Sequence, residues 1–240
     1  MIEIRNVYKT YDKQKYVLTD VSLDIEDGDI YAFIGHNGAG KTTLIKSIVG
    51  ILPFEKGEIK INGIDVNQNP EESKKVIAYI PDEPEIYDSL TGLQFLNFVA
   101  DAFNVSEVDR KERIEHYAQV FEMTEHLNNL VSSYSHGMKQ KTIIMSALIH
   151  DPKVIIMDEP FVGLDPKASI ILKQLMGDFV KNGGCIFYST HVLDTAEKIC
   201  NKIAVIKNGE IVKAGSRDVI LKDESLEQVF MEIYGEAQNA

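Results

Sequence analysis

A glycine-rich segment between an apolar run and a helical pattern constrains this chain more than any other feature. Residues 35–42 (GHNGAGKT) fit the pattern G-x-x-x-x-G-K-[ST] at every fixed position. They directly follow the strand-like residues 30–34 and lead into a helical pattern over residues 42–49. Glycines let the backbone wind closely round a phosphate chain, and the N–H groups at a helix start then face the anionic oxygens. The segment therefore predicts a loop that binds the phosphates of a nucleotide.

The residue types of this loop also predict its individual contacts. Lys41 is a point charge that can neutralise the β and γ phosphates, and the Thr42 hydroxyl can ligate Mg²⁺. The residues expected to contact the nucleotide are Gly35, Asn37, Gly38, Gly40, Lys41, Thr42 and Thr43.

A second motif, at residues 154–159 (VIIMDE), is an apolar run that ends in two carboxylates. We expect Asp158 to hold Mg²⁺ through a water molecule, and Glu159 to take a proton from the water that attacks the nucleotide. Because side chains alternate along a strand, the two carboxylates are expected to point to opposite sides if the strand continues.

Strand and helix patterns alternate along the chain and predict an α/β fold. Short β-branched runs fill the first third, apolar residues recur at helical spacing from Thr91 to about His150, and strand patterns return from residue 153 onward. This order favours a mostly parallel sheet, covered on both faces and interrupted by a helical insertion. Within a single domain over residues 1–240, the expected parts are a core with a β-subdomain (1–80 and 151–215), a helical subdomain (81–150) and a helical tail with a frayed end (216–240).

Charge and cysteine content exclude several classes of protein. The chain has 25 Lys and Arg against 37 Asp and Glu, a formal net charge of −12, without a basic cluster, so no nucleic-acid partner is expected. No apolar run approaches the about 18 residues of a membrane span, and the N-terminal residues lack the plan of a signal peptide. Cys185 and Cys200 form neither a disulfide framework nor a metal-binding pair, which favours a cytoplasmic protein with both cysteines in its core.

Three further motifs lie at residues 134–140 (YSHGMKQ), 163–165 (GLD) and 189–191 (STH). In their order and spacing, the five motifs resemble those of the nucleotide-binding subunit of ATP-binding cassette (ABC) transporters over essentially the whole chain. The resemblance implies a P-loop NTPase (RecA-like) core, an N-terminal antiparallel β-subdomain and an inserted α-helical subdomain. It also implies ATP and Mg²⁺ as cofactors and ATP hydrolysis as the activity.

The resemblance implies further roles residue by residue. Tyr11 matches the aromatic residue that stacks on adenine, although an ordinary half-buried strand aromatic is the alternative. Ser135 and Gly137 match the signature loop, which contacts the γ phosphate bound by the opposite subunit. Asp165 matches the acid that crosses the dimer interface, and His191 matches the switch histidine beside the γ phosphate and the attacking water. No catalytic role is expected for the remaining histidines, His36, His116, His126, His136 and His150.

Two departures from the commonest family pattern are visible. Asp82 stands where the family usually has glutamine; its oxygens can still hold Mg²⁺ or water, but it is shorter and adds negative charge. His136 and Met138 stand where a second glycine and a glutamine are commoner. Together with residues 81–84 (PDEP) and 158–166 (DEPFVGLDP), these features look most like bacterial exporter-type subunits, closest to the Ecs group.

The implied assembly is a homodimer that closes around two Mg·ATP and drives a separate transmembrane permease from the inner face of the cell membrane. The permease is expected to dock on residues 82–90 and the start of the helical pattern at 93–103, unless these side chains only pack the helical block onto the sheet. A soluble ABC ATPase that acts as a clamp in DNA repair or translation is the alternative. The single cassette, the absence of a heptad run and the acidic charge disfavour it. Residues 201–204 (NKIA) lack the aspartate that reads guanine, which excludes a GTPase.

Overall fold

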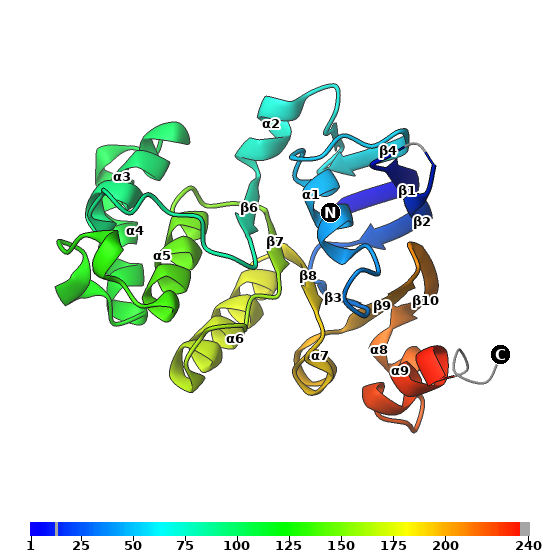
Figure 1. Ribbon diagram of the computed structural model, residues 1–240. Coiled ribbons are helices and arrows are strands. Elements are labelled where there is room, and N and C mark those ends of the chain that lie inside the picture. The colour runs from blue at the N-terminus through cyan, green and yellow to red at the C-terminus, as the bar shows by residue number, and fades with distance from the viewer. Residues whose placement is uncertain (13, 236–240) are drawn as a thin grey trace.

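The computed structural model describes residues 1–12 and 14–235, and within these ranges the chain forms two β-sheets with helices around them (Figure 1). The first sheet is antiparallel and has the strand order β2-β1-β4-β5. The second has the order β10-β9-β3-β8-β7-β6 and is parallel except for β10, which pairs antiparallel with β9. The strands are β1 (Ile2–Thr10), β2 (Tyr16–Ile25), β3 (Ile30–Ile34), β4 (Lys56–Ile61), β5 (Ile64–Asp65), β6 (Ile77–Ile80), β7 (Val154–Asp158), β8 (Cys185–Thr190), β9 (Lys202–Lys207) and β10 (Glu210–Ser216).

Burial explains why the central strands read as continuous apolar runs. Every residue of β3, β7 and β8 is buried, because both faces of the parallel sheet are covered. In β3, Tyr31 and Phe33 join the core between the two sheets, whereas Ala32 and Ile34 join the core on the opposite face. Because side chains alternate along a strand, β3 contributes to both hydrophobic cores of the molecule.

The helices form groups that follow the chain order. Figure 1 shows α3, α4 and α5 together beside the β6 and β7 edge of the parallel sheet, with α8 and α9 near β9 and β10. The helices are α1 (Lys41–Ile48), α2 (Pro70–Lys75), α3 (Gly92–Ala102), α4 (Glu107–Val120), the 3-10 turns Thr124–His126 and Val131–Ser133, α5 (His136–Leu148), α6 (Pro166–Lys181), α7 (Leu193–Ile199), α8 (Arg217–Leu221) and α9 (Leu226–Gly235). Since α3 to α5 lie between β6 and β7 in sequence, the helical block is an insertion into the sheet.

The expected fold class is confirmed: a parallel core sheet, an N-terminal antiparallel sheet and a helical insertion. The tail contains α8 and α9, while the frayed end expected after residue 235 lies outside the described residues. Cys185 and Cys200 are free and buried, as expected. None of the helices in residues 1–12 and 14–235 combines the length and the apolar character needed to cross a membrane. The subdomain boundaries drawn from the sequence stay a prediction.

Candidate nucleotide-binding site

The glycine-rich loop connects β3 to α1, and two of its glycines, Gly35 and Gly40, have no room for a Cβ atom. A Cβ atom on Gly35 would lie 2.7 Å from the carbonyl oxygen of Ile206, and one on Gly40 would lie 2.9 Å from the Leu18 side chain. Gly40 also has a φ of 113°, which L side chains rarely adopt. It precedes α1 without a side-chain cap, and the first turn of α1 has no acidic residue. The free N–H groups of that turn are therefore suited to an anion.

A pocket of about 370 Å³ opens in front of this loop. It lies where β3, β6 and β7 end at their carboxyl ends, the usual ligand position in an open α/β sheet. Most of the residues expected to bind nucleotide and Mg²⁺ line it. The lining consists of Val17, His36, Asn37, Gly38, Gly40, Lys41, Thr42, Thr43, Asp82, Asp158 and Glu159.

The Lys41 ammonium group is buried in this pocket and is already partnered. Its Nζ donates a hydrogen bond to the Gly35 carbonyl oxygen at 2.7 Å and lies 3.7 Å from Oε1 of Glu159. A phosphate that enters the pocket meets a cation held in position by the loop itself. Lys41 can therefore turn to the phosphate with little loss of rotamer freedom.

The condition for opposite orientations of Asp158 and Glu159, a strand that continues, is not met, and both residues line the same pocket. The cause is the end of the strand: β7 stops at Asp158, and Glu159 has a φ of 47°, in the left-handed region. The backbone N–H of Glu159 donates to the carbonyl oxygen and to the hydroxyl of Ser189, both at 3.2 Å. These contacts with β8 hold the turn that brings Glu159 beside Lys41.

His191 is in direct contact with Glu159. Its Nδ1 lies 3.0 Å from Oε2 of Glu159, and its backbone N–H donates to the same oxygen at 3.2 Å. The Glu159 side chain is nearly buried, whereas His191 is exposed and reaches it from the end of β8. The Glu159 carboxylate is thus oriented from both sides, by Lys41 and by His191.

The residues expected to hold Mg²⁺, namely Thr42, Asp82 and Asp158, meet in the same pocket. Asp158 accepts a hydrogen bond from the Ser189 hydroxyl. Burial raises the pKa of the Asp82 carboxyl from its ordinary value, and the negative charges of Asp158 and Glu159 raise it further. Among the described residues no group of three or more His, Cys, Asp and Glu side chains is arranged as a metal site. A hydroxyl, one or two carboxylates and open positions for water and phosphate fit Mg²⁺, which keeps several such ligands.

Tyr11 stands at the rim of the pocket. It follows β1, its side chain is 62% exposed, and its hydroxyl lies 3.1 Å from the Thr43 hydroxyl. Lys9 Nζ lies 5.5 Å from the centre of the ring. This exposed position does not match the alternative of a half-buried strand aromatic.

Ser135, Gly137 and Asp165 lie outside this pocket, although they carry predicted site roles. Ser135 is the N-cap of α5, where its hydroxyl accepts a hydrogen bond from the Met138 N–H at 3.3 Å. Asp165 is the N-cap of α6 and lies 2.8 Å from Nζ of Lys141. The hydrogen bond from Lys141 lowers the pKa of Asp165, as does that from the Ala168 N–H. The predicted residues therefore fall into two groups, one around the phosphate loop and one at the starts of α5 and α6.

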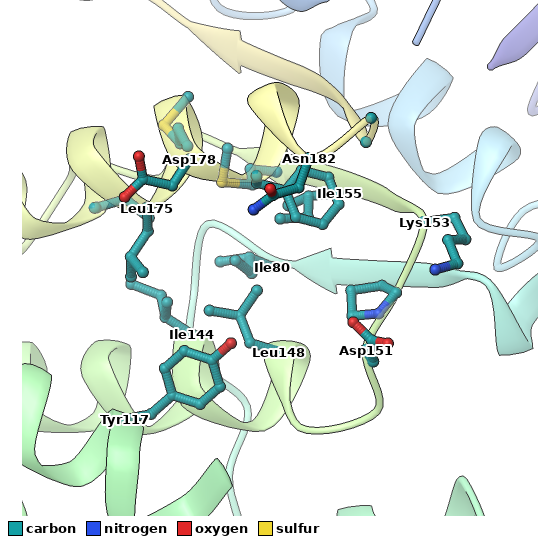
Figure 2. Close-up of a pocket in the computed structure, with 17 residues that line it drawn as sticks. Ile80, Tyr117, Ile144, Leu148, Asp151, Lys153, Ile155, Leu175, Asp178 and Asn182 are labelled. Atoms are coloured by element: carbon teal, nitrogen blue, oxygen red, sulfur yellow. The ribbon is translucent and has the colours of Figure 1, made fainter. Parts of the chain in front are cut away.

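A second cavity, of about 290 Å³, lies between α5, α6 and the strands β6 and β7 (Figure 2). Its wall is mainly apolar, with Ile80, Ile144, Leu148 and Ile155 pointing into it (Figure 2). None of the residues predicted to bind nucleotide or metal lines this cavity. It includes no part of the phosphate loop between β3 and α1, so the pocket at that loop is the better nucleotide site.

Ser189 is a site residue that the sequence reasoning missed. It contacts both carboxylate residues, through the Asp158 side chain and the Glu159 backbone. Its position two residues before His191, at the end of an apolar run, was the available signal. Val17 was also missed; it lies on β2, far from the loop in sequence, and no local pattern marks it.

Comparisons with known proteins agree with this geometry. A profile described as ABC transporter matches residues 18–162. The ABC-type transporter ATP-binding protein EcsA of Bacillus subtilis (strain 168) is 36% identical over 222 residues, which cover 90% of each chain. A solved ATP-binding subunit of an ABC transporter is 34% identical, with a TM-score of 0.93 over 98% of this chain and 99% of that one. The dimeric ATP-binding cassette MJ0796 bound to ADP and Pi is 25% identical, with a TM-score of 0.81 over 90% and 99% of the two chains.

Proposed function

The chain belongs to the ABC transporter family, and from this membership we propose that it is the ATP-hydrolysing motor subunit of a membrane exporter. The general part of this function follows from family membership: the chain is an ATP-binding subunit that uses Mg²⁺ and hydrolyses ATP to ADP and phosphate. A clamp in DNA repair or translation is not favoured, because the relatives that match over nine-tenths of both chains are transporter ATP-binding proteins. The export direction, the residue roles and the partners form the proposal.

The observation that carries the proposed chemistry is the Lys41–Glu159–His191 arrangement: Lys41 and Glu159 line one pocket, and His191 contacts the Glu159 carboxylate. Lys41 and the N–H groups of the loop bind the β and γ phosphates, and Tyr11 stacks on the adenine. Thr42, Asp82 and Asp158 hold Mg²⁺, which neutralises charge on the phosphate oxygens. Glu159, oriented by His191, takes a proton from water. The water oxygen bonds to the γ phosphorus while the bond to the bridging oxygen breaks, which releases ADP.

The positions of Ser135, Gly137 and Asp165 support a homodimer as the catalytic form. They lie outside the pocket that holds Lys41, so a single chain leaves the γ phosphate without them. We propose that a second copy presents its own Ser135 and the start of its α5 to this phosphate, and that Asp165 lies at the contact between the copies. A helix start with free N–H groups suits the anionic γ phosphate.

An exposed apolar surface supports a membrane partner. We define the docking surface as residues 82–90 together with Phe98. Tyr87 and Phe98 are 60% and 53% exposed, and their rings meet edge to face with centroids 5.8 Å apart. Exposed aromatic residues in contact are typical of an interface centre.

The docking surface adjoins the nucleotide site. A cavity of about 510 Å³ is lined by Asp82, Glu83 and Glu85, and also by Thr42 and Asp158 of the nucleotide site. The acidic side chains favour a permease segment that carries apolar and basic residues. We propose that the subunit lies on the inner face of the cell membrane with this surface against the permease. Asp82 would then respond to both the nucleotide and the permease.

Replacement of Ile86 and Tyr87 by serine tests the docking. The double variant should bind ATP as the parent chain does, because neither side chain lines the phosphate pocket, and it should fail to co-purify with the permease with which the parent chain co-purifies. Val108→Ser, at a 77% exposed position on α4, is the matched control and should co-purify normally. Full co-purification of the folded double variant would place the docking surface elsewhere.

A further inference from the structure

The last described helix, α9, is attached to the first turn of the phosphate loop. The Tyr234 hydroxyl donates a hydrogen bond to the Ile206 carbonyl oxygen and accepts one from the His36 N–H at 3.3 Å. One hydroxyl therefore joins the end of β9 to the residue that follows Gly35.

Aromatic rings make a second contact at the same place. The His36 ring lies edge-on to Tyr234 and Phe230, with centroids 4.1 and 4.8 Å away. Lys207 also contacts α9, since its Nζ donates to the Ile233 carbonyl oxygen at 2.5 Å and lies 5.4 Å from the Tyr234 ring centre. The contact thus includes ring packing, a bridging hydroxyl and a cation.

The part of the loop that α9 contacts also positions Lys41, the proposed phosphate-binding lysine. Lys41 donates to the carbonyl oxygens of Gly35 and His36, at 2.7 and 3.5 Å. Gly35 packs against Ile206, whose carbonyl oxygen accepts the Tyr234 hydrogen bond. A displacement of α9 would therefore alter the two carbonyl groups that hold the Lys41 ammonium group in the pocket.

We propose that Tyr234 is a positioning residue for ATP binding, through which α9 holds the phosphate loop in its binding conformation. The inference rests on the proposed role of this loop and of Lys41. A loop ordered before the nucleotide arrives loses less conformational entropy on binding, so the contact lowers the KM for ATP rather than raising kcat.

The test compares variants of Tyr234 in steady-state ATP hydrolysis. Tyr234→Phe keeps the ring and removes the bridging hydroxyl, and it should raise the KM for ATP by about 3- to 10-fold with kcat nearly unchanged. Tyr234→Ala also removes the ring contact with His36 and should raise KM further. Met231→Ala, at a 62% exposed position on the same helix, is the control and should leave both constants unchanged.

Two further measurements distinguish the ways in which this proposal could be wrong. They are the melting temperatures of the Tyr234 variants and the binding of ATP by Lys41→Ala. A Tyr234→Phe variant with parental KM, a lower KM, or a loss confined to kcat or melting temperature overturns the positioning role. If Lys41→Ala loses ATP binding while Tyr234→Phe has the parental KM, the loop assignment holds and only the role of α9 falls. If Lys41→Ala binds ATP normally, both the loop assignment and this inference are wrong.

Discussion

Glu159 shows how one backbone angle determines the chemistry of the site. A φ of 47° on a residue that is not glycine is uncommon and costs free energy of about 1–3 kcal/mol. The turn is stabilised by hydrogen bonds from the Glu159 N–H to Ser189. The strained turn directs the Glu159 carboxylate into the pocket, toward Lys41 and His191.

Glu159→Gln should bind ATP and hydrolyse it more slowly by a factor of about 10²–10⁴, because it removes the proposed general base and keeps the loop. Rapid-quench measurement of phosphate release, together with ATP binding by filtration, checks both parts. Glu112→Gln, an exposed change on α4, is the control and should hydrolyse ATP normally. Turnover of Glu159→Gln at the parental rate would contradict the role of Glu159 as base.

Asp82 should make the stability of the nucleotide-free chain depend on pH. Its pKa is raised above the ordinary 3.8 by burial and by the charges of Asp158 and Glu159, so the folded chain holds this proton more tightly than the unfolded chain. Ionisation of Asp82 therefore lowers the free energy of unfolding as pH rises through the raised pKa. The cost is fully present above that pKa and absent below the unfolded value.

Asp82→Asn removes this cost. It should raise the free energy of unfolding at neutral pH, and the gain should shrink as the pH falls toward 3.8. Urea denaturation of both chains across this pH range, without nucleotide, measures the difference. A gain that does not change with pH, or a loss of stability at neutral pH, would show that repulsion among these carboxylates is not significant.

Most individual site residues could be predicted from the sequence, because the loop and the acidic strand end are local patterns. Lys41, Thr42 and Asp158 need only their neighbours in the chain to be recognised. The direction of Glu159 could not be predicted from its neighbours, since side-chain alternation applies only while the strand continues. Its turn depends on hydrogen bonds with Ser189, which lies 30 residues away in sequence.

At the scale of elements, the start of α5 has a capping role and a proposed nucleotide contact that can be separated. Ser135 caps the helix, and we propose that it also faces the γ phosphate of a second copy. Ser106 caps α4 in the same way, with its hydroxyl accepting from the Asp109 N–H at 3.1 Å, and α4 has no proposed contact with nucleotide. The two serines therefore form a matched pair.

Ser135→Asp keeps a side chain that caps helices well, so stability should hardly change, but its negative charge should repel the γ phosphate and abolish ATPase activity. Ser106→Ala should lose about 1 kcal/mol of stability with its cap and keep full activity. Denaturation curves and ATPase rates on both variants make the comparison. An active Ser135→Asp enzyme would limit the role of Ser135 to capping.

The elements themselves were predicted well where apolar runs are bounded by turn residues. Strand patterns were expected from residue 153 onward, and β9 (Lys202–Lys207), with the sequence NG directly after it, is one of them. Strand ends depend on pairing between strands: β8 extends to Thr190, which pairs with Ile34, and β7 reaches Asp158, which pairs with Ser189. Such pairings join residues far apart in the chain, and no local pattern contains them.

At the scale of the whole molecule, the central claim is that one chain holds only part of each ATP site. The phosphate loop and Glu159 line one pocket, whereas Ser135 and Asp165 cap helices outside it. The contact of α9 with the loop is also a property of the whole fold. It joins His36 to a residue 198 positions later, and the sequence alone did not indicate it.

Sedimentation velocity of the Glu159→Gln chain tests the central claim most directly. Without nucleotide it should sediment as a monomer or a weak, salt-sensitive dimer, and with saturating Mg·ATP it should sediment as a stable dimer. Adding Ser135→Asp to the same chain should return the monomer while ATP still binds. A Glu159→Gln chain that stays monomeric with Mg·ATP bound would contradict the shared site, as would a dimer that is indifferent to Ser135→Asp.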